Sequence, residues 1–238
     1  MKHVSKLSLR RLPWLYLAYA LFNDLVWFVL LLVLSYVQSG SVKAMAFFLT
    51  LVGCIALPIA SILCIYGLID LSDYFRKSCY AFLLSMIFLM ANMILGFVLK
   101  MPEGDTAQSM MPVMSEAREV LLDLRVPVDV LAAWFLLKGF AAALEKAKDQ
   151  KVYRRCTVLG RIVAFLGIVY CVLVLLTEIS SSFVDGGLWN GEGFVMAFSL
   201  LALVVTGILM LFVIPVFLVL RAAAKQTYGF LAGREEAN

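Results

Sequence analysis

The chain has 238 residues, of which 63% are hydrophobic and 15% are charged, and its mean hydropathy is +0.98. Soluble domains contain about 45–50% apolar and about 25% charged residues, so the composition excludes an ordinary soluble domain and predicts an integral membrane protein. The formal net charge of +4 is spread over several short segments and forms no basic stripe, so nothing indicates a nucleic-acid partner.

The first apolar segment follows a basic tail that contains Lys2, Lys6, Arg10 and Arg11. A secretory signal peptide begins in a similar way, but its apolar region has only about 7–15 residues and ends at a cleavage site. Here the apolar segment covers residues 13–37, and no convincing cleavage motif follows it. We therefore predict a retained transmembrane helix with Pro13 in its first turn.

Five further segments are long enough to cross a bilayer, which takes about 20 apolar residues in a helix. They cover residues 44–69, 79–99, 127–144, 158–177 and 194–220. Backbone amides in lipid must be satisfied by internal hydrogen bonds, so such segments form helices. We predict an all-α integral membrane protein, a bundle of six transmembrane helices in one polytopic domain over residues 1–238.

The distribution of Lys and Arg predicts the orientation of this bundle. Fourteen of these residues lie in the tails and in the loops on one side of the six predicted spans, and four lie on the other side. Cytoplasmic loops carry the excess of positive charge, so we expect both termini in the cytoplasm. The short loops, and the lack of an N-x-S/T acceptor in the external ones, fit the plasma membrane of a bacterium.

The longest loop, residues 100–126, lies between the third and fourth predicted spans. Ser115 resembles a helix N-cap, and acidic residues follow it in the first turn, which predicts a short helix over residues 116–124. The apolar side chains of Val120, Leu121 and Leu124 would hold this helix along the outer membrane interface.

Two charges lie midway along apolar segments, Asp24 in the first span and Lys138 in the fourth. A charge inside the bilayer is costly, so both residues are candidates for a transport role. Both lie roughly 13–17 Å from the inner surface, which would allow direct contact if the two spans pack together. The alternatives are a structural ion pair, or a Lys138 side chain that extends inward beside Glu145 on the same helix face.

Two asparagines in predicted spans are further polar candidates. Asn23 continues a stripe with Tyr16, Tyr19 and Trp27 at helical spacing, and this stripe either lines a polar cavity or bonds to a neighbouring helix. Asn92 in the third span is expected to form a hydrogen bond between helices.

The second span carries small residues on one helical face: Gly53, Ala56, Ala60, Cys64 and Gly67. Such a ridge allows another helix to approach closely, so it predicts helix packing, either within the bundle or with another membrane protein. Pro58 lies off this face and is expected to kink the span.

The sequence contains no signature of catalysis or of a cofactor. Its single histidine, His3, lies in the N-terminal tail, and there is no P-loop, G-x-S-x-G or H-E-x-x-H motif. None of the five cysteines lies in a predicted external loop, so no disulfide framework is expected. We therefore expect neither an enzyme nor a metal or cofactor protein.

Two functional hypotheses remain. The first is an accessory, assembly or scaffold component of a membrane system, which binds another membrane protein through the small-residue ridge of the second span. The second is a small permease or ion-coupled transporter that uses Asp24 and Lys138, with Asn23 beside them. The lipid bilayer is the expected surrounding in both.

Overall fold

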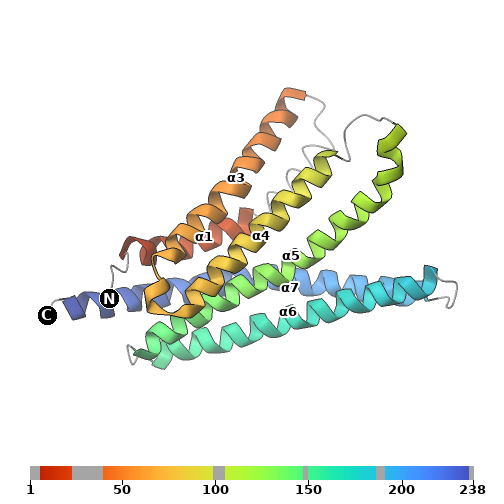
Figure 1. Cartoon of the computed structure of the whole chain (residues 1–238). Helices are drawn as coiled ribbons and strands as arrows, with labels where there is room; N and C mark the ends of the chain where they lie inside the picture. The colour runs from red at the N-terminus through yellow and green to blue at the C-terminus, as the bar shows by residue number, and fades with distance from the viewer. Residues whose placement is uncertain (1–5, 23–39, 99–104, 147–149, 186–190, 236–238) are drawn as a thin grey trace.

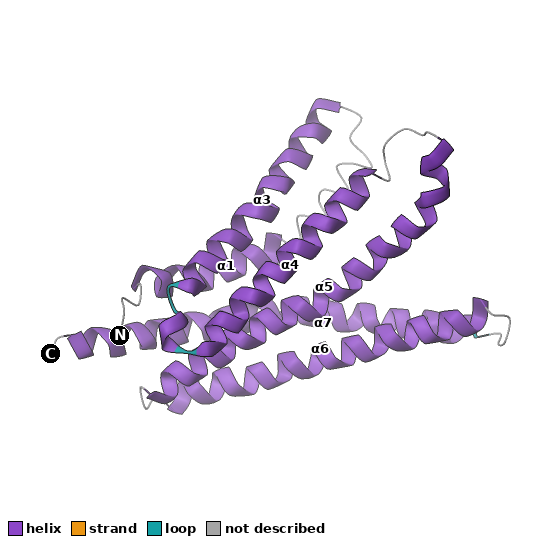
Figure 2. Cartoon of the chain, viewed as in Figure 1, coloured by secondary structure: helices purple, strands orange, loops and turns teal. Residues whose placement is uncertain are grey.

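The computed structural model describes residues 6–22, 40–98, 105–146, 150–185 and 191–235. These ranges are helical throughout, apart from short turns, and contain no strand (Figures 1 and 2). The expected all-α class is therefore confirmed for the described part of the chain. The elements are α1 (Lys6–Leu21), α3 (Gly40–Tyr66), the 3-10 helix η2 (Ile69–Leu71), α4 (Asp73–Val98), α5 (Asp105–Lys146), α6 (Gln150–Asp185) and α7 (Glu192–Glu235).

Four stretches of these helices are long and apolar enough to cross a membrane: Asp73–Asn92, Asp123–Glu145, Gln150–Phe183 and Gly193–Ala232. They correspond to the third to sixth predicted spans. In the second predicted span, the apolar stretch that the structure describes, Ile55–Tyr66, is shorter. Most of the first predicted span lies outside the described residues. The chain is thus a helical membrane protein, and the total of six crossings stays a prediction.

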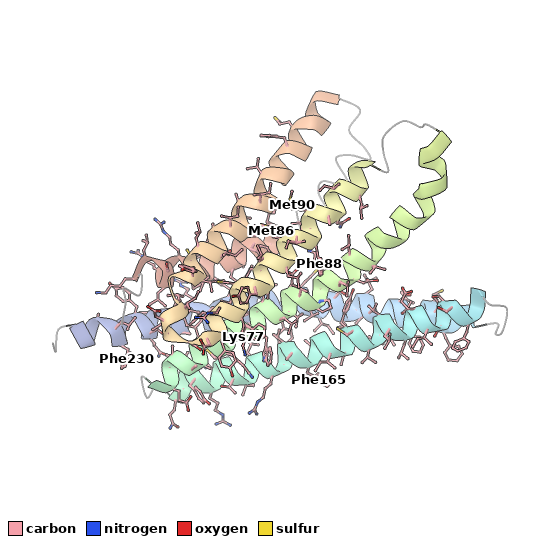
Figure 3. The ribbon with its side chains drawn as sticks, in the orientation of Figure 1. Lys77, Met86, Phe88, Met90, Phe165 and Phe230 are labelled. Carbon is pink, nitrogen blue, oxygen red and sulfur yellow. The ribbon has the colours of Figure 1, made fainter. Side chains whose placement is uncertain are left out.

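The outward face of α6 is suited to contact with lipid and not with water. Between the exposed charges of Arg161 and Glu178, its exposed side chains are aliphatic, aromatic or cysteine, over a rise of about 26 Å along the helix axis. Phe165, in the middle of this face, is 65% exposed (Figure 3). An apolar face of this length comes close to the thickness of the hydrocarbon core of a bilayer, which is about 30 Å, and would promote aggregation in water.

The helices form a closed ring in chain order. Each of α1, α3, α4, α5, α6 and α7 packs against the next, α7 returns to α1, and α5 also contacts α7 across the ring. Successive helices run in opposite directions, so both chain ends and the turns after α3 and α5 lie at one end of the molecule (Figure 1). Towards the other end, α3, α4 and the first half of α5 diverge from α6 and α7.

This alternation brings the basic residues of separate loops to the same end of the bundle. Arg76 and Lys77 begin α4, Arg154 and Arg155 begin α6, and Lys225 lies near the end of α7. The pattern is the one that the charge distribution predicts. The assignment of this end to the cytoplasm remains a prediction.

Three local predictions are wrong. Residues 116–124 do not form a separate interfacial helix, because α5 is continuous from Asp105 to Lys146. Pro127 lies inside α5 instead of opening a span, and α5 is visibly bent (Figure 1); proline frees a backbone carbonyl and bends a helix without ending it. Pro13 is also interior, because α1 begins at Lys6 and not beside the proline.

The core of the bundle is organised by one face of α4. Its residues recur at alternating steps of three and four: Phe75, Ser78, Phe82, Ser85, Leu89 and Asn92. All six are at most 3% exposed. Large apolar side chains thus alternate with small polar ones along the face that packs on α5, which is the spacing of a left-handed helix pair.

Candidate functional site

A carboxylate on α5 is the centre of the main polar cluster in the bundle. Tyr19 of α1 donates a hydrogen bond of 2.8 Å to Oδ1 of Asp129, and Ser85 of α4 donates one of 2.6 Å to the same oxygen. The two hydroxyl oxygens are themselves 2.6 Å apart. Three helices therefore meet at a triangle of oxygen atoms, which we call the Asp129 triangle.

Each member reaches the triangle through its helix packing. Ser85 lies on the buried face of α4 and is 0% exposed. The ring of Tyr19 contacts Phe82, one turn from Ser85, edge to face at a centroid distance of 5.0 Å, and this contact fixes the position of its hydroxyl. Apolar packing thus holds three polar side chains at hydrogen-bonding distance.

Arg125 supplies a positive charge one turn before the aspartate. Its Nε lies 3.5 Å from Oδ2 of Asp129, and the residue is only 8% exposed. Among the residues that the structure describes, this Nε has no hydrogen-bond partner. A buried ion pair recovers its desolvation cost only with good geometry and further hydrogen bonds, so a long contact of this kind gives little net stability.

The geometry of the triangle determines how many protons its three oxygen atoms can share. Its three oxygen–oxygen contacts are all 2.8 Å or shorter, yet the two hydroxyls contribute only two protons. With an ionised carboxylate, one of the three contacts has no proton between its oxygens. A proton on Asp129 would complete a cyclic chain of three hydrogen bonds, in which each group donates once and accepts once.

The Asp129 side chain is 28% exposed, because it borders a cavity of about 100 Å³. The lining comes from α1, α4, α5, α6 and α7, and its polar members besides Asp129 are Tyr16, Tyr19 and Thr206. A buried water needs about 10–15 Å³ and two or more polar partners, so the cavity has room for several waters beside the carboxylate. We call this the inner cavity.

A second cavity, of about 250 Å³, lies between α5, α6 and α7. Asp123 and Glu178 line it, and Tyr170 donates a hydrogen bond of 3.2 Å to Oδ1 of Asp123. Thr206 lines both cavities, so they adjoin at this residue. We call this one the outer cavity, because its lining residues Glu178 and Ser199 lie in the last part of α6 and the first part of α7, away from the basic residues that begin α4 and α6.

Lys138 lies in a different place from the Asp129 triangle. Its Nζ is 4.2 Å from the ring centroid of Trp134 and 5.4 Å from that of Tyr74. Lys138 and Glu145 both line a groove between α4, α5 and α6. Asp24 and Asn23 lie outside the described residues, so their pairing and their place in the stripe stay predictions.

Other helices of the chain bury the small-residue ridge of α3 only in part. Ala56 is exposed, whereas Ala60, Cys64 and Gly67 are half-buried. Gly53 lies directly under the ring of Phe22, since a Cβ there would come within 2.0 Å of it. Among the α3 side chains whose burial the structure describes, the buried ones, Pro58, Ser61 and Ile65, lie on a neighbouring face.

Asn92 is 3% exposed on the buried face of α4, where an interhelical hydrogen bond was expected. Asp129, Arg125 and Ser85 were not among the predicted site residues. The sequence signal for Ser85 is the seven-residue spacing of Ser78, Ser85 and Asn92 in an apolar helix, which marks one polar line along a packed face. Ser78 continues this line with a bond of 3.1 Å to the Ala132 carbonyl.

Within the described ranges, no three His, Cys, Asp or Glu side chains lie close enough together to hold a metal ion. Comparison with protein-family models, with curated proteins and with solved structures found no match to this chain. The geometry of the site therefore carries the functional argument alone.

Proposed function

We propose that this membrane protein is a small ion-coupled carrier in which Asp129 binds and releases a proton. The observation that carries the proposal is the Asp129 triangle, where three oxygens at hydrogen-bonding distance border a cavity inside the bundle. Ionisable residues within membrane helices are costly, and they commonly form proton relays or ion pathways.

Each protonation state of Asp129 has a chemically suited neighbour. The ionised carboxylate is next to Arg125, whose charge offsets its own. The protonated carboxyl closes the cyclic hydrogen bonds with Tyr19 and Ser85. A reversible proton carrier needs neighbours for both states of its carboxyl group, because the proton must be released as well as bound.

The outer cavity supports a route to this site. Its two carboxylates, on Asp123 and Glu178, attract cations from the end of the bundle away from the basic turns. Thr206 connects this cavity to the inner one. The proposed carrier thus uses Asp129 in the role that the sequence suggested for Asp24.

Charge displacement tests the proposal. Proteoliposomes on a solid-supported membrane are subjected to a pH jump, and the transient current from proton binding is recorded. We expect a current with the wild type and none with Asp129→Asn. Asp73→Asn, which alters an exposed carboxylate at the start of α4, is the matched control and keeps the current. A wild-type current in Asp129→Asn would contradict the proposal.

An accessory or scaffold role is the second candidate, supported by the exposed Ala56 on the small-residue ridge of α3. In that case a partner helix would cover Ala56, and Ala56→Leu would prevent co-purification of that partner in mild detergent. The pH-jump current separates the two roles, because a packing component has no need of a proton-binding carboxylate.

The proposed location is the plasma membrane of a bacterium, with both termini in the cytoplasm. The support is the collection of basic residues at one end of the bundle, next to both chain ends (Figure 1). The outer cavity would then face the cell exterior.

A further inference from the structure

A groove of about 580 Å³ lies between α1 and α7 at the basic end of the bundle. Arg10 on α1 and Arg221 and Lys225 on α7 line it, together with the aromatic side chains of Trp14 and Tyr228. Arg221 lies over the ring of Trp14 at 5.5 Å, and this ring also contacts Phe217 at 4.9 Å. The groove therefore has an aromatic side and a cationic side.

Among the described residues, no carboxylate forms an ion pair with any of these three cations. The sequence has no Asp or Glu in α1, and none in α7 between Glu192 and Glu235. Within the part of the chain that the structure describes, no carboxylate lines the groove. Arg10, Arg221 and Lys225 are all exposed, so their charges are available to an anion.

The outward face of α7 changes character at the level of the groove. Leu211, Ile214 and Leu218 are 71%, 57% and 54% exposed, and they continue at the same helical spacing into Arg221 and Lys225. This transition marks the boundary between hydrocarbon and headgroups on this side of the bilayer, where Trp and Tyr side chains are also enriched. The three cations of the groove thus lie at headgroup depth.

We propose that this groove binds the headgroup of an anionic phospholipid. The phosphate would lie among Arg10, Arg221 and Lys225, the acyl chains would follow the exposed leucines and Ile214 of α7, and Trp14 would separate the two regions. Basic pockets between transmembrane helices bind anionic headgroups for this reason. The apolar surface next to the cations favours a lipid over free phosphate, which has no acyl chain to place there.

Lipid retention in mild detergent tests the proposal by native mass spectrometry. The full chain is mixed with equal amounts of phosphatidylglycerol and phosphatidylcholine, and bound copies of each are counted. We expect preferential retention of phosphatidylglycerol by the wild type. The variant Arg10→Gln/Arg221→Gln/Lys225→Gln should lose at least about tenfold in this preference, since each cation near an anionic surface contributes about fivefold.

A matched control changes three cations at the same end that do not line the groove, Arg76→Gln/Lys77→Gln/Arg154→Gln. This variant should keep the preference for phosphatidylglycerol. An equal loss of the preference in both triple variants would overturn the proposal, because it would indicate attraction to the general basic surface. Displacement of the lipid by glycerol phosphate at equimolar concentration would also overturn the proposal of a lipid site, since the headgroup alone would then be sufficient for binding.

A second measurement leaves the groove intact. In a variant whose other three tryptophans, Trp27, Trp134 and Trp189, are changed to Phe, brominated phosphatidylglycerol should quench Trp14 fluorescence more strongly than brominated phosphatidylcholine. Equal quenching by both lipids would contradict a specific site.

Discussion

Ser85 of α4 and Asp129 of α5 are joined by a hydrogen bond of 2.6 Å in the interior of the helix bundle. Tyr19 of α1 bonds to both of them, so this one contact connects three helices that are far apart in the sequence. The bond lies on the α4 face where Ser78 and Asn92 occupy equivalent positions one heptad away on either side. It therefore contributes both to packing and to the proposed proton site.

Ser85→Ala removes the shorter of the two bonds to Asp129 and leaves a small void. We expect a loss of about 0.6–1.7 kcal/mol in the free energy of unfolding, the range measured for hydrogen bonds between membrane helices. Thermal unfolding in detergent measures it. Ser182→Ala is the control, because its hydroxyl is exposed and bonds only to the Glu178 carbonyl of its own helix. Equal stability of Ser85→Ala and the wild type would show that the bond has no net effect.

Tyr19→Phe separates packing from proton binding. The ring contact with Phe82 is kept, so we expect a stability loss of only about 0.6 kcal/mol. The pH-jump current should nevertheless fall strongly, because the cyclic arrangement with Ser85 and Asp129 no longer forms. Tyr16→Phe alters a tyrosine of the same cavity that is not part of the Asp129 triangle, and it should keep most of the current. Equal currents in both variants would argue against the triangle as the proton site.

Gly167→Ala tests the close approach of α6 to α5. A Cβ at Gly167 would lie 2.5 Å from Cγ1 of Val130, and the branched valine has little rotamer freedom with which to move away. We expect the variant to lose about 1–3 kcal/mol of stability through overpacking. A Cβ at Gly207 would meet nothing within 4 Å. Gly207→Ala should therefore raise the free energy of unfolding by about 0.5–1 kcal/mol, because alanine replaces a glycine in the interior of a helix. Similar unfolding temperatures for the two variants would contradict this helix spacing.

The orientation of the bundle can be measured with reporter fusions. Fusions after Thr106, near the start of α5, and after Gln150, at the start of α6, should report opposite sides of the membrane, with Gln150 in the cytoplasm. The physical reason is the excess of Lys and Arg at the Gln150 end. Both reporters in the same compartment would exclude α5 as a membrane-crossing helix.

Hydropathy was sufficient to locate the four long apolar stretches in α4, α5, α6 and α7, because every backbone amide in lipid is satisfied within its own helix. It did not locate their ends. Charged and polar flanks extend α6 and α7 well beyond their apolar segments, to Asp185 and Glu235. The proline at position 127 and the cap-like Ser115 would break or begin a helix in water, yet α5 passes through both.

The candidate site was harder to predict than the fold. Asp129 lies four residues from Arg125 and close to the boundary of the predicted fourth span, where charges are common, so it carried no special signal alone. Its role depends on Tyr19 and Ser85, which are 110 and 44 residues away in the chain. Only the packing of α1, α4 and α5 brings these three together, and that packing follows from the heptad face of α4.

Water access to Asp129 is the claim on which the proposed function depends, and cysteine labelling measures it directly. In a background without the five native cysteines, Thr206→Cys places a thiol between the inner and outer cavities, and Ala132→Cys places one at a position that is 1% exposed on α5. A membrane-impermeant thiol reagent, applied from the side away from the basic turns, should label Thr206→Cys and leave Ala132→Cys unlabelled, with both labelled after denaturation. If Thr206→Cys is as unreactive as Ala132→Cys in the folded protein, no aqueous route reaches the carboxylate and the carrier proposal is wrong.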